Sequence, residues 1–393
     1  MRVLIDREGG AGARDLAQAW AEPTSFAFLP GKSGHREAWS DEALGALPEA
    51  LREGHFALLS SGSTGEPKLV VGSRARSEAL ARLLHEAQQS EPARAAVGLL
   101  PLTYCYAFVN QWLWARVMGR AFVPTAGFAR PEELAAALEE APASMLCLVA
   151  AHVPLFERHF SGRAFPEVVR VHFAGGRFPQ DRLDSVRAFF PGAVIYNNYG
   201  CIEAMPRLTL RRAEEGESAS DVGRPLPGVE LTADGEGRLL FRSPFGAVGF
   251  VDAAGFHAVA SQEWISTGDL GHGDASGRWF LDGRAGEVFK RYGERISLPQ
   301  LLDTVRAAWP GDAAFYRATD SLGEAGHALV VAPHPSPEAL RAILARLRRD
   351  YPRAHWPLRV ESVEEMPLLP NGKPDVAALQ QIRAKLVQWD QRV

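Results

Sequence analysis

A short loop rich in glycine and hydroxyl side chains carries the clearest chemistry in this chain. It follows an apolar run that predicts a buried strand, and it ends on a lysine. Glycines let backbone N–H groups approach the oxygens of a polyphosphate, hydroxyls donate further hydrogen bonds, and the lysine adds positive charge. The loop residues are Ser60, Ser61, Gly62, Ser63, Thr64, Gly65, Glu66, Pro67 and Lys68. The Walker pattern fits them in no frame, so the alternatives are another kind of phosphate loop and an ordinary Ser/Gly turn.

Four further segments with residues suited to nucleotide chemistry follow in order along the chain. They read NYGCIE at 198–203, STGD at 266–269, GRAGEVFK at 283–290 with GERI at 293–296, and PNGK at 370–373. Together with the loop, they make the chain resemble the adenylate-forming superfamily of acyl-CoA and aryl-CoA synthetases, peptide-synthetase adenylation domains and luciferases. The resemblance covers about residues 57 to 375.

The resemblance implies a reaction in two halves. A carboxylate attacks the α-phosphate of ATP to give an acyl-adenylate and pyrophosphate, and a thiol of CoA or of a carrier-protein phosphopantetheine then displaces AMP. Its catalytic candidates here are Lys373, Glu203 and Lys68. Lys373 would place a cation where charge develops only in the transition state, and Glu203 would bind Mg²⁺ together with phosphate oxygens. The alternatives are a solvated loop lysine and a surface glutamate.

The resemblance also implies which residues bind ATP. Asp269 would accept hydrogen bonds from the ribose hydroxyls, and Arg284 would reach the ribose or a phosphate. Asp269 could instead cap a helix or close an Asx turn, and the two glycines after residue 174 could form a plain strand-to-helix turn. The full implied set is Ser60, Ser61, Gly62, Ser63, Thr64, Gly65, Gly175, Gly176, Asn198, Tyr199, Gly200, Asp269 and Arg284.

On the acid side, Tyr104 stands where the family has an aromatic residue that gates the acyl site. Phe108, Gly176 and Ile202 complete the predicted acid-binding set. The aromatic residues after Tyr104 favour an aryl acid, although aromatics at helical spacing often belong to a core instead. The loop that would face the thiol contains Lys290, Gly293 and Arg295.

Two positions depart from the family's pattern. Ile202 replaces a threonine hydroxyl that touches the phosphate region, and Gly286 replaces the acidic hinge residue. Loss of one donor to developing charge costs about 3 kcal/mol of transition-state stabilisation, about a hundredfold in rate, unless Cys201 or a water compensates. We therefore expect slow but real activity.

The length of 393 residues exceeds what one core usually supports, so we expect two domains. The resemblance implies an α/β fold with a large N-terminal domain, residues 1–283, whose mostly parallel sheets are flanked by helices and accompanied by a small β layer. A hinge at 284–287 would lead to a small mobile α+β domain, residues 288–393. Only 59 residues precede the phosphate loop, where the family has an additional subdomain. A natural short form, with strands missing from one sheet, is the expectation, and a fragment of a longer protein is the alternative.

Apolar periodicity predicts the elements that position these residues. Strands are expected at 57–60, 168–173 and 194–196, and the last two flank a helix, which is the βαβ signature of a parallel sheet. Further on, the apolar run 328–332 marks the tail. Helices are expected over residues 40–52, 78–88, 132–140, 179–190 and 337–350.

Composition excludes several classes of function. The formal charge of −4 gives no support for nucleic acid or an anionic membrane as partner, and no window has the ~18 apolar residues of a membrane span. Three separated cysteines without metal spacing favour a reducing cytoplasm. The expected partners are a small carboxylic acid and possibly an acyl carrier protein.

Two other functions stay open. Ile202 and Gly286 are compatible with a ligase-like protein that binds a nucleotide or acyl ligand without turnover, and a luciferase-type monooxygenase would share the motifs. A protein without catalysis has no chemical need for the five motif residues together, which favours the ligase. These five are Lys68, Glu203, Asp269, Arg284 and Lys373.

Overall fold

The chain has the predicted α/β architecture in a computed structural model, which describes residues 2–6, 11–31, 35–61, 67–216, 218–260, 262–320, 323–368, 374–382 and 384–391. It divides into two compact units. The large unit comprises Met1–Thr232, Leu240–Thr267 and Gly273–Phe280. The small unit comprises Ala233–Leu239, Gly268–His272 and Leu281–Val393. The proposed hinge at 284–287 includes the short 3-10 turn η7 (Ala285–Glu287), and its role as a hinge stays a prediction.

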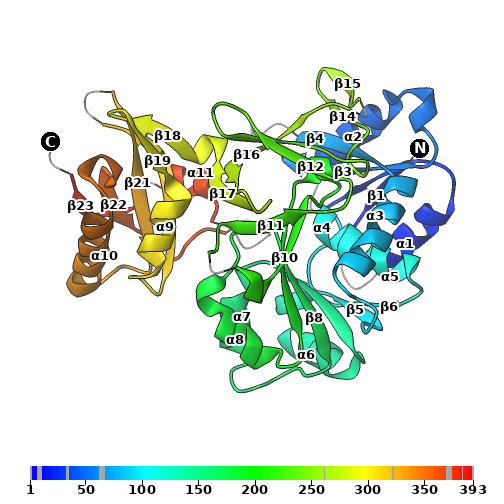
Figure 1. Ribbon diagram of the computed structural model, residues 1–393, viewed down its shortest axis with the longest axis horizontal. Coiled ribbons are helices and arrows are strands. Elements are labelled where there is room, and N and C mark those ends of the chain that lie inside the picture. Colours follow the sequence, from blue (N-terminus) through cyan, green and yellow to red (C-terminus); the bar gives the residue numbers. More distant parts are fainter. Residues whose placement is uncertain are drawn as a thin grey trace. The chain divides into compact units, whose positions relative to one another are not determined.

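The first sheet of the large unit positions the phosphate loop (Figure 1). Its strands, in sheet order, are β1 (Arg2–Ile5), β2 (Phe26–Leu29), β3 (His55–Ser61), β4 (Pro67–Ser73), β14 (Gly249–Asp252) and β15 (Gly255–Ala258). The strands β1, β2 and β3 are parallel, and β4 returns antiparallel to β3 with Ser60 opposite Lys68. The two strands on either side of the predicted phosphate loop are therefore paired with each other, and the strand predicted at 57–60 is confirmed within β3.

The helix predicted over residues 40–52 is wrong. The structure has α1 (Ala11–Ala21), then α2 (His35–Gly45), and after a break at Pro48 the separate 3-10 turn η1 (Glu49–Leu51). Proline lacks the N–H that would continue the helix and disfavours helical backbone at the residue before it, so α2 ends first. The predicted loss of strands from one sheet relative to the family stays a prediction.

The second sheet places the other predicted motifs of the large unit at the carboxyl ends of its parallel strands. Its eleven described strands, in sheet order, are β12 (Glu230–Ala233), β13 (Arg238–Arg242), β16 (Ile265–Gly273), β17 (Trp279–Arg284), β11 (Asp221–Pro225), β10 (Thr209–Arg212), β9 (Val194–Tyr199), β8 (Val168–Phe173), β7 (Ser144–Leu148), β5 (Ala95–Gly98) and β6 (Ala121–Pro124). The strands β6, β5, β7, β8 and β9 are parallel, which confirms the predicted βαβ unit. Ligands of such sheets bind beyond the carboxyl ends of the strands.

Helices and short turns connect these strands. Between β4 and β9 the chain forms α3 (Arg74–Ala87), α4 (Cys105–Ala107), the π-helix η2 (Phe108–Leu113), α5 (Trp114–Val117), η3 (Gly127–Ala129), α6 (Pro131–Glu140), α7 (His152–His159), η4 (Gln180–Arg182) and α8 (Leu183–Phe189). After β9 come η5 (Ile202–Ala204) and η6 (Ala213–Glu215). The helices predicted at 78–88 and 132–140 are confirmed by α3 and α6, and the helix predicted at 179–190 begins with the 3-10 turn η4.

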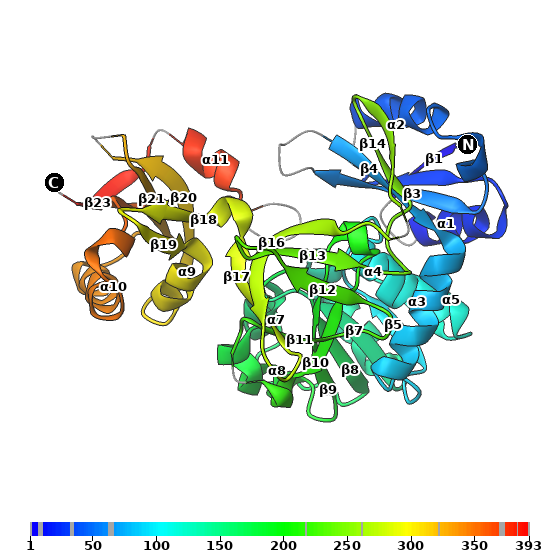
Figure 2. The ribbon, with the colours of Figure 1, turned by 45° about the horizontal axis from the view of Figure 1, so that its top comes forward.

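The small unit is an α+β sandwich around one antiparallel-rich sheet (Figure 2). Its strands and helices are β18 (Val288–Arg291), β19 (Glu294–Ser297), α9 (Leu298–Arg306), β20 (Asp312–Thr319), β21 (Ala325–Ala332), α10 (Pro337–Asp350), η8 (Arg353–His355), β22 (Arg359–Ser362), α11 (Val376–Gln381) and β23 (Leu386–Asp390). Successive side chains of β20 point to opposite faces of the sheet and join two different hydrophobic clusters. Phe315 packs in the cluster that contains residues of α9 and α10, whereas Tyr316 packs in the cluster that contains Leu379 of α11. The helix predicted at 337–350 is confirmed. No helix in the described residues is long and apolar enough to cross a bilayer.

His327, buried in the small unit, should make folding sensitive to acid. Its ring packs edge-on against Phe289 and Phe315, and burial, with a smaller contribution from the charge of Arg291, lowers its pKa to about 3. Below pH 6.5, His327 binds a proton in the unfolded chain but stays neutral in the folded chain. The free energy of unfolding therefore falls as the pH drops toward 3, by about 2 kcal/mol at pH 5.

We therefore expect His327→Phe to remove about 2 kcal/mol of the loss in unfolding free energy between pH 7.5 and pH 5, measured by urea denaturation. The exposed His159, which has no ion pair among the described residues, is replaced in the same way as the control and should leave the pH dependence unchanged. An equal loss of stability in native protein and His327→Phe would contradict the prediction.

Candidate active site

An ion pair joins two of the predicted catalytic residues. Lys68 is the second residue of β4 in the first sheet, and Glu203 lies beyond β9 of the second. Lys68 Nζ is 2.7 Å from Glu203 Oε1. The two side chains are 29% and 17% exposed, so the pair is screened only in part. Lys68 Nζ also lies 4.8 Å from the ring centre of Phe250. The fold thus brings together two segments that lie 135 residues apart in the sequence.

A tight reversal after β9 places Glu203. A Cβ added to Gly200 would lie 1.8 Å from the carbonyl oxygen of Pro206, so only glycine allows the two backbones to approach. Glu203 lies in η5 inside this reversal, and its carbonyl oxygen accepts from Ala247 N–H at 2.9 Å. The chain then returns as β10, antiparallel to β9, with Thr209 opposite Tyr199. The Gly200 motif is therefore a steric requirement of this turn.

The carboxyl ends of β8 and β9 supply the predicted nucleotide-side residues. Asn198 is buried, and its Nδ2 donates to the carbonyl oxygen of Phe173 at 3.0 Å. Its Oδ1 is also buried and accepts from no described residue, which leaves an acceptor that fits an amino group such as that of adenine. Tyr199 is buried beside it.

Gly175 and Tyr104 are in direct contact. Gly175 has φ +76°, and a Cβ there would lie 2.1 Å from the Tyr104 hydroxyl. The next glycine, Gly176, faces open space, with no heavy atom within 4 Å of its added Cβ. Burial and then the charge of Glu203 raise the pKa of the Cys105 thiol, which places the start of this helical segment near Glu203 as well. The structure therefore brings Tyr104, Gly175 and Glu203 to one region of the large unit.

Phe108, a predicted acid-binding residue, is part of the core. Its side chain has no exposed surface, and its ring stacks on Phe56 at 4.9 Å and contacts Trp112 at 5.2 Å and Trp20 at 5.6 Å. Phe108 is thus a core residue, which is the alternative that the sequence left open for the aromatic residues after Tyr104. Ile202 is half-buried in η5 next to Glu203.

The small unit holds the remaining described site residues. Asp269 is buried, and its Oδ1 lies 2.9 Å from Nε of Arg284, whose side chain is 58% exposed. The predicted thiol-side residues belong to the β18–β19 hairpin: Lys290 is exposed in β18, Gly293 turns with φ +84°, and Arg295 lies 3.4 Å from Asp282. Five predicted residues lie outside the described part of the chain, namely Gly62, Ser63, Thr64, Gly65 and Lys373.

The described residues fit Mg²⁺ only as a partner of phosphate. No group of three or more His, Cys, Asp or Glu side chains within the described ranges could hold a metal ion by itself. A single carboxylate, Glu203, suits Mg²⁺ that keeps waters and phosphate oxygens as its other ligands. Because Lys68 now neutralises Glu203, a bound nucleotide would exchange this ion pair for Lys68–phosphate and Glu203–Mg²⁺ contacts.

Two buried polar residues near this region were missed from the sequence. Arg207, four residues after Glu203, is 1% exposed, and its Nη2 donates to Oδ1 of Asn110 at 2.9 Å. Burial lowers the pKa of Arg207 to about 10. Nothing in the local sequence marks either residue, because their contact spans 97 positions.

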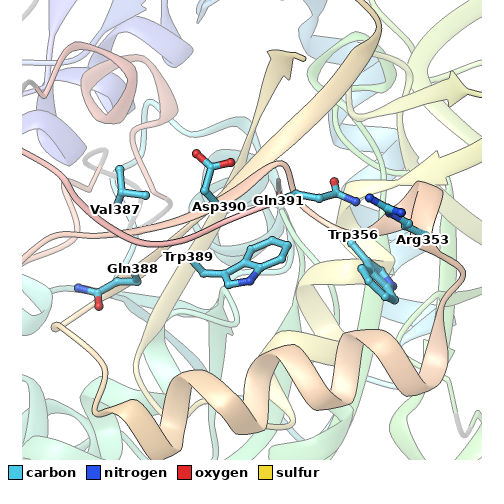
Figure 3. Close-up of a pocket in the computed structure, with 7 residues that line it drawn as sticks. All are labelled: Arg353, Trp356, Val387, Gln388, Trp389, Asp390 and Gln391. Carbon is cyan, nitrogen blue, oxygen red and sulfur yellow. The ribbon is translucent and has the colours of Figure 1, made fainter. Parts of the chain in front are cut away.

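A cavity of about 750 Å³ in the small unit lies apart from every predicted site residue (Figure 3). The strand β23 and the turn η8 line it. Its walls are Arg353, Trp356, Val387, Gln388, Trp389, Asp390 and Gln391. None of these belongs to the motifs, so the cavity is no part of the candidate site.

Comparisons with known proteins agree with this geometry. The family model described as AMP-binding enzyme matches residues 25–249, more than half of the chain. A 3-[(3aS,4S,7aS)-7a-methyl-1,5-dioxo-octahydro-1H-inden-4-yl]propanoyl:CoA ligase of Mycobacterium tuberculosis is 29% identical over 196 residues, which are 48% of this chain and 38% of that protein. The chain thus spans well under half the length of that relative.

Two further proteins resemble longer parts of the chain. A D-alanine–D-alanyl carrier protein ligase of Staphylococcus haemolyticus is 23% identical over 343 residues, covering 81% of this chain and 69% of that ligase. The o-succinylbenzoate CoA synthetase of Bacillus subtilis, solved with an acyl-adenylate intermediate, is 16% identical and superposes with a TM-score of 0.78 over 97% of this chain and 88% of its own. This last likeness shows a shared fold.

The Lys68–Glu203 pair predicts how Mg²⁺ and ATP bind together. Glu203→Gln removes the counter-charge of Lys68 and the carboxylate for the metal. We expect ATP binding in EDTA to be unchanged or tighter, and the gain in affinity from Mg²⁺ to fall about tenfold, since a ligand–metal contact is lost. Calorimetric titration with and without Mg²⁺ measures both. Glu86→Gln, at an exposed position of α3, is the control, and an equal Mg²⁺ effect in all three proteins would contradict the role of Glu203.

Proposed function

Because the chain belongs to the AMP-binding enzyme family of adenylate-forming proteins, we propose that it activates a carboxylic acid with ATP and passes the acyl group to a thiol. The observation that carries this proposal is the meeting of Lys68 and Glu203 beside the carboxyl ends of β8 and β9. It provides a cation for phosphate and a carboxylate for Mg²⁺ at the edge where such sheets bind nucleotides.

In the first half-reaction, a carboxylate oxygen of the acid attacks the α-phosphorus of ATP, and the bond to the β-phosphate oxygen breaks to release pyrophosphate. Lys68 would bind the leaving phosphates, and Glu203 would hold Mg²⁺, which when bound supplies positive charge to phosphate oxygens. Lys373 approaches the oxygen that joins acid and phosphorus. Each of these cations acts on charge that grows toward the transition state.

Three of the predicted residues would hold the nucleoside. Asn198 Oδ1 accepts from the base, and Asp269 accepts from the ribose hydroxyls after Arg284 has turned toward the ribose or a phosphate. Support for this comes from the buried, unpartnered state of Asn198 Oδ1 among the described residues and from the exposure of the Arg284 side chain. A buried acceptor without a donor costs free energy that such a ligand would recover.

We propose an aryl acid as substrate, held near Tyr104 and Gly176. The ring of Tyr104 lies edge-on to that of Tyr106 at 6.1 Å, and its hydroxyl touches Gly175. In the second half-reaction, a thiol sulfur attacks the acyl carbon and AMP leaves. The thiol belongs to CoA or to a carrier-protein phosphopantetheine, a choice supported by relatives whose names include a CoA ligase and a D-alanyl carrier protein ligase.

The second candidate is a ligase-like protein that binds nucleotide or acyl ligand without turnover. Ile202 favours it, because an apolar side chain stands next to Glu203 where the family has a hydroxyl. ATP–pyrophosphate exchange over aryl, short-chain and long-chain acids separates the two candidates. We expect exchange with at least one aryl acid, and its absence with every acid, despite ATP binding, would favour the second candidate.

Lys373 should matter in one half-reaction only. We expect Lys373→Ala to lower the rate of adenylation about a hundredfold or more, because its charge acts only while the carboxylate attacks phosphorus. Thiolysis of a supplied acyl-adenylate should change much less. Single-turnover rates of both halves provide the measurement. Arg341→Ala, at an exposed position of α10, is the control and should change neither rate. Equal losses in the two halves would mean that Lys373 is structural.

A further inference from the structure

Arg207 is a buried cation that no step above uses. Its Nη2 donates to Asn110, while its Nε and Nη1 are buried and find no acceptor among the described residues. Its guanidinium carbon lies 5.5 Å from the ring centre of Tyr106, and no described carboxylate forms an ion pair with it. Tyr106, Cys147 and His172 are buried titratable groups that interact with it. Burial raises the pKa of Tyr106 and Cys147 and lowers that of His172, so all three stay neutral. Among the described residues, no negative charge therefore compensates that of Arg207.

The backbone of Arg207 closes the reversal that carries Glu203. A Cβ on Gly200 would lie 3.0 Å from Cα of Arg207, and the next residue, Leu208, donates its N–H to the carbonyl oxygen of Tyr199 at 2.9 Å. These two contacts join the two ends of the loop, and Glu203 lies within that loop. A shift of Arg207 would therefore move one end of the loop that presents Glu203 to Lys68.

The partner of Arg207 is itself held firmly. Asn110 lies in the π-helix η2, donates from Nδ2 to the sulfur of Cys147 in β7 at 3.0 Å, and accepts from Nε2 of Gln88 at 3.2 Å. A π-turn inserts an extra residue into a helix and occurs often at functional sites. Asn110 therefore ties Arg207 to the central sheet and to the end of α3, both in the large unit.

A buried charge without a counter-charge lowers the stability of the fold, whereas an apolar side chain of similar volume is often neutral or stabilising there. We propose that Arg207 is a positioning residue, which ties the Glu203 loop to Asn110 of the π-helix and so holds Glu203 within reach of Lys68. The proposal rests on the proposed function only for the role of Glu203, because the tie itself is a property of the fold.

The test replaces Arg207 by methionine, which keeps volume and loses every donor. We expect amide hydrogen exchange in peptides covering residues 199–208 to become about tenfold faster or more, since one hydrogen bond from a charged donor is lost. The Mg²⁺ concentration for half-maximal pyrophosphate exchange should rise about tenfold with the KM for the acid unchanged. The unfolding midpoint should stay equal or rise. Arg207→Lys, which keeps the charge and one donor, should restore part of the protection.

Arg74→Met is the matched control. Arg74 is also buried, but it donates to the carbonyl oxygens of Trp20, Glu22 and Thr24, none of which belongs to residues 199–208. Its loss should lower the unfolding midpoint and leave both the Mg²⁺ dependence and the exchange of residues 199–208 unchanged. The variant Asn110→Asp changes the acceptor of the Arg207 hydrogen bond instead of its donor. It gives Arg207 a carboxylate and should raise the unfolding midpoint while the loop keeps its slow exchange.

Unchanged exchange of residues 199–208 in Arg207→Met, or equal acceleration in Arg74→Met, would overturn the proposal. If Arg207→Met does not fold, Asn110→Asp decides: a lower unfolding midpoint, or faster exchange of the loop, overturns it. Failure of the proposed function has a different signature. The native protein would then show no pyrophosphate exchange with any acid, while hydrogen exchange would still decide whether Arg207 holds the loop.

Discussion

The close approach of two backbones at Gly200 is the constraint on which the candidate site depends. The carbonyl oxygen of Pro206 occupies the space that any side chain at Gly200 would need. This contact lets β9 and β10 form an antiparallel pair whose connection stands at the carboxyl edge of the parallel strands. Glu203 projects from that connection, and without the reversal it would have no fixed position relative to Lys68.

Two cations near this reversal differ in whether a negative charge lies beside them. Lys68 is partly exposed and paired with Glu203, so its charge is compensated and can be released to a phosphate at small cost. Arg207 is buried and has only the amide of Asn110 as an acceptor among the described residues. A buried charge of this kind costs stability, and this cost is the reason for the positioning role proposed for Arg207.

Aromatic residues show why periodicity cannot separate a core from a binding site. Phe108 and Tyr104 belong to one continuous segment, and both were candidates for the acid pocket. Phe108 is enclosed by Phe56, Trp112 and Trp20, whereas Tyr104 is only half-buried and touches Gly175. Both positions are apolar and regularly spaced, and only the packing of the neighbouring sheet decides which ring faces a ligand.

The sequence by itself determined the family, the order of the motifs and most strongly periodic elements, because these signals lie in contiguous residues: β8 and α10 match their predicted bounds. Tertiary structure alone decided the pairing of Lys68 with Glu203, the contact of Arg207 with Asn110 and the burial of Phe108. Each of these joins residues far apart in the chain, 135 and 97 positions in the first two cases. Such contacts depend on sheet order and strand register, which a local pattern of residues does not encode.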